Sequence, residues 1–439
     1  MINLRGTFRI LGMTLGEYDA VIRRIEQVRD VPAKPESFER MRGALATLKL
    51  KFSEGGKGIV LVAGTNGKGT VAKTLETLLG GECDGAVGLF TSPHLMRTTE
   101  RIRSFGRDLS DEEFVTVFAK VEATVNQYGL SHFEILTLMM AEVFFGGWIR
   151  PCVLWAVIEV GVGGRLDPTR LIPHNTSVVT TLALDHVDLL GPTLRDIARE
   201  KFAIVDDGGL LVHRALPWAE IESDVVRTCA PDRSIRRVIA PEYQFHVDKN
   251  GPTWVMETPW GEVALGLPGR RAVENSSLAL TVYRELGFDP LKGLSKLARV
   301  EWPCRMERFR IRGREVYLSG DHNPEGVVSL AEILRHFRYR SLELVVGIGA
   351  KKDTETMLTE FSQLPRARLR LTTTPFRGAP LAMYGDWLNR SVAYDEDPLQ
   401  AVERAIKESH EDDLIVCTGS LYMVGFLREQ ILAGRYRDE

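Results

Sequence analysis

The residues with the clearest chemical potential form a glycine-rich loop, Gly64-Thr65-Asn66-Gly67-Lys68-Gly69-Thr70. The loop follows the apolar run 58–63 and precedes a helically spaced stretch at 71–79, which is the order strand, loop, helix. Backbone N–H groups in such a loop attract phosphate, Lys68 can reach terminal phosphates, and the Thr70 hydroxyl can meet Mg²⁺. Its spacing departs from the common GxxxxGK[ST] loop because Gly69 separates the lysine from the threonine. The pattern favours a phosphate-binding loop over an ordinary glycine-rich turn.

Three further polar residues, Glu159, His186 and Lys201, are candidates for metal binding or catalysis. For each of them the residues alone also allow an ordinary structural role. Glu159 ends the apolar run 153–160, and a carboxylate at the mouth of a parallel sheet suits Mg²⁺, although a capping or solvent-facing acid has the same pattern. For His186 the residues alone favour a hydrogen-bonded loop histidine, because Mg²⁺ prefers oxygen ligands. Lys201 reads as a solvated lysine on a helix that starts after Thr193.

The elements that position these residues alternate between strands and helices. With 439 residues the chain is too long for one typical domain, which holds roughly 150 residues. Apolar runs predict buried parallel strands at 58–63, 153–160 and 177–182, and strands again at 315–318, 342–347, 369–373 and 413–418. Helical spacing occupies 275–286, 324–337 and 398–410, whereas 214–269 reads as a strand-rich insert or antiparallel edge. We predict an α/β protein with domains 1–298 and 299–439.

Composition excludes several classes of protein and names no chemistry. Lys and Arg number 56 and Asp and Glu 59, and the net charge of −3 gives no whole-chain attraction to nucleic acid or membrane. Five scattered cysteines without a CxxC pair argue for a reducing compartment. Neither a signal peptide nor the ~18-residue apolar stretch of a membrane helix is visible. We expect a cytoplasmic monomer with small-molecule substrates and no nucleic-acid or membrane partner.

Further motifs follow the glycine-rich loop in order and carry a family resemblance. They are Thr91-Ser92-Pro-His94-Leu with Glu100-Arg101, the segments 159–167 and 184–191, Arg199-Glu-Lys201, Trp302-Pro-Cys-Arg305, His322-Asn-Pro324 and Thr418-Gly-Ser420. Together they resemble the folylpolyglutamate synthase/dihydrofolate synthase family of the Mur-ligase superfamily, most strongly over residues 59–205. The resemblance implies an N-terminal P-loop-type Mur-ligase ATPase domain with a mostly parallel sheet and a C-terminal Rossmann-like α/β domain, which binds glutamate.

The resemblance also implies an activity. The family converts a carboxylate into an acyl phosphate with ATP, and the amino group of L-glutamate then attacks it to give an amide, ADP and phosphate. The acceptor implied here is dihydropteroate, tetrahydrofolate or both, which places the chain in folate biosynthesis and one-carbon metabolism. Such chemistry needs metal ions to neutralise phosphate charge, and two Mg²⁺ sites are implied.

The family pattern assigns roles residue by residue. Magnesium ligands are implied at Ser92, Glu159 and His186, beside Thr70 of the loop, and Lys201 is implied to be an N-carboxylated lysine that helps to hold a second metal. Lys68, His186 and Lys201 are the expected catalytic residues. The remaining implied contacts are Ser131, Phe133, Leu166 and Asp167 for the pterin substrate, Asn275, Arg305 and Asp321 for ATP, and His322 and Ser420 for glutamate. On its own, Phe133 suits a plain core position equally well.

Three departures from the family pattern concern nucleotide placement and the acceptor. The usual His-Gln before Asn275 is replaced within 269–274, and the ribose-binding aspartate is replaced by Ser319, with Asp321 two residues further on. The stretch 34–50 lacks the family's acidic-glycine substrate segment, although 38–41 echoes part of it. Two alternatives remain: another Mur-type amino-acid ligase with a non-pterin acceptor, and a nucleotide-binding module that has lost catalysis.

Overall fold

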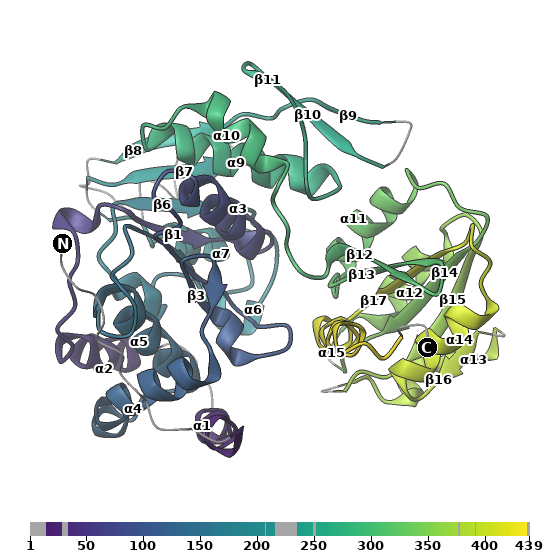
Figure 1. Cartoon of the computed structure of the whole chain (residues 1–439), viewed down its shortest axis with the longest axis horizontal. Helices are drawn as coiled ribbons and strands as arrows, with labels where there is room; N and C mark the ends of the chain where they lie inside the picture. Colours follow the sequence, from purple (N-terminus) through teal and green to yellow (C-terminus); the bar gives the residue numbers. More distant parts are fainter. Residues whose placement is uncertain are drawn as a thin grey trace, which may run out of the picture. The chain divides into compact units, whose positions relative to one another are not determined.

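The computed structural model describes residues 15–28, 34–206, 208–215, 235–248, 252–350, 352–375, 378–390 and 392–436. The chain divides into two compact units (Figure 1). The first comprises residues 1–72, 79–94 and 98–239, and the second comprises 73–78, 95–97 and 240–439. Contacts therefore group 240–298 with the C-terminal part of the chain, whereas the domain boundary expected from sequence follows residue 298. That functional boundary stays a prediction.

The first unit is organised around an eight-stranded sheet with the order β4-β3-β2-β5-β1-β6-β7-β8. Strands β2, β5, β1, β6 and β7 pair with one another in parallel, and β3 and β4 continue the sheet beyond β2 as antiparallel strands. Its strands are β1 (Ile59–Ala63), β2 (Val87–Phe90), β3 (Ile102–Ser104), β4 (Arg107–Asp108), β5 (Trp155–Glu159), β6 (Thr176–Val179), β7 (Leu210–Arg214) and β8 (Arg236–Ala240). Because the central strands are parallel, the segments that follow β2, β5, β1 and β6 emerge at one edge.

Helices cover this sheet and complete its core. They are α1 (Leu15–Gln27), α2 (Pro35–Ala46), α3 (Lys68–Gly80), α4 (Asp111–Tyr128), α5 (His132–Phe145), α6 (Val187–Leu190) and α7 (Leu194–Phe202), with the short 3₁₀ turns η1 (Glu54–Gly56), η2 (Thr98–Arg101) and η3 (Pro168–Leu171). Every residue of α5 from Glu134 onward is buried, so this helix is the centre of the first hydrophobic core. A Ser110–Glu113 capping box starts α4, and Thr193 caps α7.

The segment between the two large sheets forms a small antiparallel sheet and two helices. The sheet has the order β11-β10-β9 and is followed by a helical pair. Its elements are β9 (Phe245–Val247), β10 (Trp254–Thr258), β11 (Gly261–Ala264), α9 (Arg270–Glu285) and α10 (Pro290–Leu297). The strand-rich character predicted for 214–269 is confirmed here, except at residues 216–234 and 249–251, which lie outside the described residues.

The last sheet has six strands in the order β12-β13-β17-β14-β15-β16, and only β12 is antiparallel to its neighbour. Its strands are β12 (Arg305–Ile311), β13 (Arg314–Ser319), β14 (Leu342–Gly347), β15 (Ala367–Thr372), β16 (Ala393–Asp395) and β17 (Leu414–Thr418). Its helices are α11 (Pro324–Leu334), α12 (Thr354–Ser362), the turn η4 (Leu381–Tyr384), α13 (Gly385–Asn389), α14 (Pro398–Glu408) and α15 (Leu421–Leu432).

Both faces of this sheet are covered by helices, as expected for buried parallel strands. Leu344 and Val346 of β14 pack with α11 and α12, whereas Val345 between them packs with α14 and α15. Successive residues of a strand point to opposite faces, so this one strand contributes to two cores. The predicted parallel α/β architecture is thereby confirmed, and within the described residues no helix is long and apolar enough to span a membrane.

Candidate active site

The glycine-rich loop lies between the end of β1 and the start of α3, at the edge where the parallel strands end. Gly64 has a φ of 147°, and a Cβ at this position would lie 1.8 Å from Thr180 Oγ1. Gly67 caps α3 with a φ of 85°. Both positions favour glycine because L side chains rarely adopt such backbone angles and Gly64 has no space for one. The local sequence thus folds into the tight strand-to-helix turn that phosphate binding requires.

The loop is held by the segment that follows β6. Thr65 N–H donates to Thr181 O at 2.8 Å, Asn66 N–H donates to Thr181 Oγ1 at 2.9 Å, and Thr180 Oγ1 donates to Asn66 O at 2.7 Å. Sequence reasoning missed both threonines. Their only sequence signal is that two hydroxyl residues follow a buried strand next to β1. They fix the loop backbone before any ligand binds.

Two lysines converge on one carbonyl oxygen of the loop. Lys68 Nζ donates to Gly64 O at 3.1 Å and to Thr65 O at 3.2 Å. Lys201, from α7, donates to the same Gly64 O at 2.8 Å and is 4% exposed. Within the described residues Lys201 forms no ion pair with a carboxylate. Positive charge is therefore concentrated beside the loop.

This environment changes the acidity of Lys201. Burial, together with the charge of Lys68, lowers the pKa of Lys201 to about 7, and the more weakly interacting carboxylates of Asp185, Asp167 and Glu200 only partly oppose the change. At neutral pH a substantial fraction of this amine is consequently uncharged. Lys201 is thus not the solvated lysine that its sequence context favours without the family pattern.

Glu159 and Ser92 meet at the same edge of the sheet. Glu159 is the last residue of β5 and is 4% exposed, and its Oε2 accepts from Ser92 N–H at 2.9 Å. Ser92 lies two residues beyond the end of β2 and precedes a cis peptide bond to Pro93. A buried carboxylate beside a serine hydroxyl supplies oxygen ligands of the kind that Mg²⁺ prefers. Glu159 is therefore neither the solvent-facing acid nor the helix cap that its sequence position also allowed.

His186 and Thr70 occupy different surroundings. His186 precedes α6 in a left-handed conformation with a φ of 49°, its side chain is half exposed, and Nε2 lies 3.7 Å from Asp185 Oδ2. Thr70 lies in the first turn of α3. Among the described residues no three His, Cys, Asp or Glu side chains form a ready metal cluster.

Asp167 organises the loop between Glu159 and η3. It is 3% exposed, and its carboxylate accepts from the N–H groups of Gly161, Val162 and Thr169 at 3.0–3.1 Å. Burial raises the pKa of Asp167 even though these hydrogen bonds oppose the change. Within this structure Asp167 shapes the loop that also carries the half-buried Leu166. Contact of either residue with a substrate stays a prediction.

Ser131 and Phe133 lie beside that loop at the start of α5. Ser131 N–H donates to Glu134 Oε2 at 2.7 Å in a capping box. The half-buried Phe133 ring lies 5.8 Å from that of Phe90, centroid to centroid, and would come within 2.7 Å of a Cβ on Gly161. The structure therefore brings the two predicted pterin segments, 131–133 and 166–167, together.

The second compact unit holds the other predicted residues, beginning with Arg305. This arginine lies at a register shift between β12 and β13, and both of its neighbours, Cys304 and Met306, have a φ of 54°. Positive φ in two non-glycine residues around one arginine is unusual and interrupts the regular alternation of the strand at this position. Glu307 stabilises the bulge by accepting from Cys304 N–H and from Arg428.

Asp321, His322 and Ser420 follow the ends of the neighbouring parallel strands β13 and β17. Ser319 Oγ donates to Asp321 Oδ2 at 2.6 Å, and Gly419 N–H donates to Asp321 O at 3.0 Å. Burial and the charges of Lys352 and Arg305 lower the pKa of His322. Lys352, which sequence reasoning missed, follows β14 and so belongs to the same edge of this sheet. Ser420 is the buried N-cap residue of α15.

Asn275 is the remaining predicted nucleotide contact. It lies on α9 and is 7% exposed. The second unit thus presents a histidine, a serine and a lysine where three parallel strands end, with Asn275 elsewhere in the unit.

Known proteins share the fold of this chain and part of its sequence. A family model described as Mur ligase, glutamate ligase domain, matches residues 304–421. The dihydrofolate synthase/folylpolyglutamate synthase of Buchnera aphidicola is 40% identical over 379 residues, which cover 83% of this chain and 87% of that protein.

Two solved structures match nearly the whole chain. Escherichia coli FolC in complex with DHPP and ADP is 25% identical, with 95% of this chain and 98% of that chain covered and a TM-score of 0.78. The bifunctional folylpolyglutamate synthase/dihydrofolate synthase of Yersinia pestis, complexed with AMPPNP and Mn, is also 25% identical, with 94% and 98% covered and a TM-score of 0.77.

Proposed function

The chain belongs to the folylpolyglutamate synthase/dihydrofolate synthase family of ATP-dependent ligases, and we propose that it joins L-glutamate to the carboxylate of a pteroate or folate acceptor. The observation that carries this proposal is that Lys68 and Lys201 both bind Gly64 O directly after β1, while the buried Glu159 ends the neighbouring parallel strand β5. These groups offer backbone donors, cations and a metal-binding carboxylate for a polyphosphate. The remaining steps follow from the chemistry of the substrates.

The residues present fit ATP with a divalent metal. The loop backbone and Lys68 would hold the phosphates, while Glu159, Ser92, Thr70 and His186 are the proposed metal ligands. A divalent metal supplies positive charge that offsets the charge of the phosphates as it is redistributed during transfer. The role proposed for Lys68 is to offset the negative charge of the phosphates from a fixed position, since its amino group is anchored to the loop by two carbonyl oxygens.

The proposed reaction has two covalent steps. An oxygen of the acceptor carboxylate attacks the γ-phosphorus, the bond to the ADP oxygen breaks, and an acyl phosphate forms. The neutral amino group of glutamate then attacks the acyl carbon, phosphate leaves, and the amine loses a proton as the amide forms. Because water competes for the acyl phosphate, the site must hold both substrates in close and dry contact.

We assign Lys201 as an N-carboxylated residue. Carboxylation of a lysine requires an uncharged amine, which the lowered pKa of Lys201, about 7, supplies. The amine nitrogen forms a bond to the carbon of CO₂ and loses a proton. The added carboxylate would replace repulsion from Lys68 by attraction and would offer oxygen to a second metal. A carbamate resonance in the ¹³C NMR spectrum with labelled bicarbonate, absent in Lys201→Met, is the expected result. Activity that is independent of bicarbonate would count against this assignment.

The acceptor and glutamate are assigned to separate groups of residues. Ser131, Phe133, Leu166 and Asp167 are proposed to line the pterin site, with the Phe133 ring as a surface for the flat heterocycle. His322, Ser420 and Lys352 are proposed for glutamate, and the charge of Lys352 suits one of its carboxylates. These assignments stay proposals for the individual side chains.

Asp321 is proposed to replace the aspartate that the family places at position 319. Ser319 Oγ occupies only Oδ2 of this carboxylate, at 2.6 Å. The serine hydroxyl thereby orients the carboxylate, and the other oxygen is available to accept from a ribose hydroxyl. Arg305 and Asn275 complete the proposed nucleotide contacts. Substitution of Asp321 by Asn is expected to raise KM for ATP more than KM for glutamate.

One assay tests the function directly. ADP release by the purified chain is measured with ATP, Mg²⁺ and glutamate in the presence of dihydropteroate, tetrahydrofolate or a muramyl dipeptide. Turnover with either pterin acceptor is expected, together with a product heavier by one glutamate residue. Turnover only with a non-pterin acid would show that the acceptor is not a pteroate or folate. ATP binding without any turnover would favour a nucleotide-binding module.

The domain limits 1–298 and 299–439, a monomeric state and a cytoplasmic location stay predictions. Gel filtration combined with light scattering tests the monomer.

A further inference from the structure

An ion pair connects α2 to the start of α5 in the first compact unit. Arg40 NH2 donates to both carboxylate oxygens of Glu134, at 2.8 and 3.1 Å. The Glu134 side chain is 7% exposed and that of Arg40 is 31% exposed, so this pair is considerably drier than a surface ion pair. Hydrogen bonds between charged groups gain strength in such surroundings.

The same glutamate positions the segment assigned to the acceptor. Glu134 Oε2 accepts both from Arg40 and from Ser131 N–H, the latter at 2.7 Å. Phe133 lies between Ser131 and Glu134 in the chain, and its ring lies against Gly161 in the loop that Asp167 organises. Rotation of Glu134 would therefore alter the start of α5 and the placement of the Phe133 ring.

Two observations indicate that α2 faces this site rather than merely supporting a helix. The helix contacts both α5 and η3, the turn that directly follows Asp167. The Nε atom of Arg40 is buried and has no hydrogen-bond partner among the described residues. A buried guanidinium N–H without an acceptor is costly, which indicates that Arg40 is kept here for its link to Glu134 rather than for stability alone.

We propose that Arg40 is a positioning residue for the acceptor: through its hydrogen bonds to Glu134 it fixes the positions of Ser131 and Phe133. The inference rests on the proposed function. It gives a role at the acceptor site to the segment 34–50, which lacks the substrate-binding pattern of the family. It concerns the acceptor alone, since ATP and glutamate are assigned to other elements.

The test is steady-state kinetics on the full chain with acceptor, ATP and glutamate varied in turn. Arg40→Met is expected to raise KM for the acceptor about tenfold, as expected for a lost charged hydrogen bond, with KM for ATP and glutamate within about twofold of wild type. Arg40→Lys keeps the charge and is expected to restore part of the acceptor affinity. Glu134→Gln is expected to resemble Arg40→Met, and the double variant to add little because both break the same link.

Arg42 supplies a matched control on the same helix. Its side chain is 60% exposed and pairs with the exposed Glu39 at 3.2 Å, so Arg42→Lys is expected to leave all three KM values unchanged. Wild-type KM for the acceptor in both Arg40 variants would overturn the inference, as would parallel changes in all three KM values with a lowered melting temperature. Arg40→Lys decides the matter if Arg40→Met does not fold. Absence of turnover in the wild type would instead refute the proposed function itself.

Discussion

Two buried cations, Lys201 beside the phosphate loop and Arg370 on β15, are accommodated in opposite ways. Lys201 donates to a backbone carbonyl and shares it with a second lysine, and its pKa falls to about 7. Arg370 has a side chain that is only 5% exposed, yet it donates to Glu343 at 3.2 Å, to Asp395 at 3.2 Å and to Glu408 at 2.6 Å. Although burial lowers the pKa of Arg370, these carboxylates raise it above its usual value.

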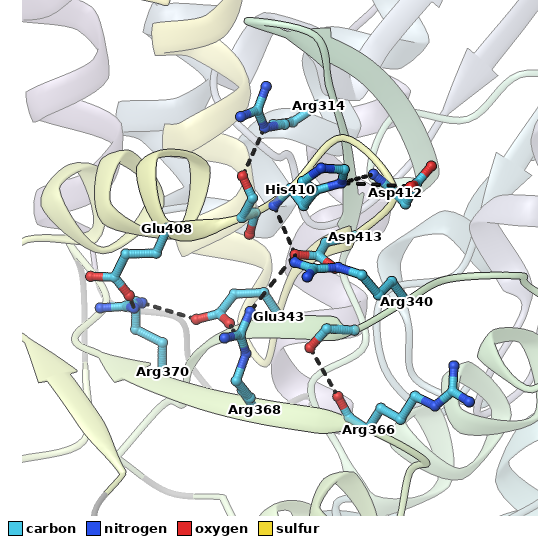
Figure 2. A network of polar contacts seen from close by, with 12 residues as sticks. Arg314, Arg340, Glu343, Arg366, Arg368, Arg370, Glu408, His410, Asp412 and Asp413 are labelled. Carbon is cyan, nitrogen blue, oxygen red and sulfur yellow. Dashed lines mark hydrogen bonds and ion pairs between the residues drawn. The ribbon is translucent and has the colours of Figure 1, made fainter.

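The surroundings of Arg370 form an extended network on the last sheet (Figure 2). Arg368 reaches Glu343 at 3.1 Å, and Arg340 donates to both oxygens of Asp413 at 2.9 and 3.0 Å. The side chain of Asp413 is fully buried. The network joins β14 and β15 to the segment before β17, at the opposite end of this sheet from Asp321, His322 and Ser420.

The difference shows what a buried charge indicates about its role. The charge of a buried cation surrounded by carboxylates, such as Arg370, is compensated, and loss of one member of such a group destabilises the fold. A cation that has no carboxylate partner among the described residues, such as Lys201, is costly to bury, and we propose that it is retained because the chemistry of the site needs it. The first type should affect stability more than activity, and the second should do the reverse.

The largest expected effect is on activity at the phosphate loop. Lys68→Ala should lower kcat by about a thousandfold, the scale of losing a group that stabilises charge in the transition state. Its melting temperature should stay near that of wild type, because Lys68 contributes only two hydrogen bonds to loop carbonyls. Kinetics and calorimetry on the same preparation check both statements. Near-normal turnover would refute the role of this loop.

The second prediction concerns a substitution in the network of ion pairs around Arg370. Arg370→Met removes the buried cation that Glu343 and Asp395 share and leaves them only the more exposed Arg368 and Arg404, so it should lower the free energy of unfolding by about 3 kcal/mol, the lower end of the range for a broken buried pair. Activity per folded molecule should stay within about twofold of wild type. Urea unfolding measures the first quantity and initial rates the second. An active-site defect in folded Arg370→Met would break the distinction between the two cations.

Lys201 should show the reverse behaviour, with a defined pH dependence. Its pKa is about 7 in the folded chain and about 10.5 when the chain is unfolded, so unfolding takes up a proton between these values. In buffer without bicarbonate, the stability of wild type relative to Lys201→Met should therefore rise from pH 7 to pH 10, by up to about 1.4 kcal/mol per pH unit. Lys201→Met should lose activity while matching or exceeding wild-type stability at pH 7. A stability difference that does not change with pH would contradict the lowered pKa.

The smallest effect is expected at the rim of the network. Glu408 is a partner of Arg370 but its own side chain is 56% exposed. Glu408→Gln should lower the free energy of unfolding by no more than about 1 kcal/mol, because water screens this pair. If Glu408→Gln lost as much free energy of unfolding as Arg370→Met, the Glu408–Arg370 pair would be less screened by water than the exposure of Glu408 indicates.

Much of the architecture was predictable from residue patterns. Continuous apolar runs predicted β1, β5, β6, β14 and β17, and the glycines of the phosphate loop predicted the turn into α3. These signals are local, because each run or turn carries its own periodicity and its own special residues. The short strands β3 and β4 were missed because two or three residues are too few to show the alternation of apolar and polar residues that marks a strand.

The surroundings of the site residues were less predictable. Thr180 and Thr181 hold Asn66 of the phosphate loop from 114 and 115 residues away, and nothing in their own segment indicates which loop they meet. The shared carbonyl of Lys68 and Lys201 likewise depends on packing of α7 against the loop. Burial and pairing decide whether a charge is structural or chemical, and both arise from contacts between distant segments.

The central claim, that the chain activates an acceptor carboxylate as an acyl phosphate, is tested most directly by isotope transfer. The acceptor is labelled with ¹⁸O in its carboxylate, and the phosphate released during glutamate ligation is analysed by mass spectrometry. One ¹⁸O atom per phosphate is predicted, since the attacking carboxylate oxygen leaves with the phosphoryl group. Released phosphate without label, or label found in AMP, would contradict the account.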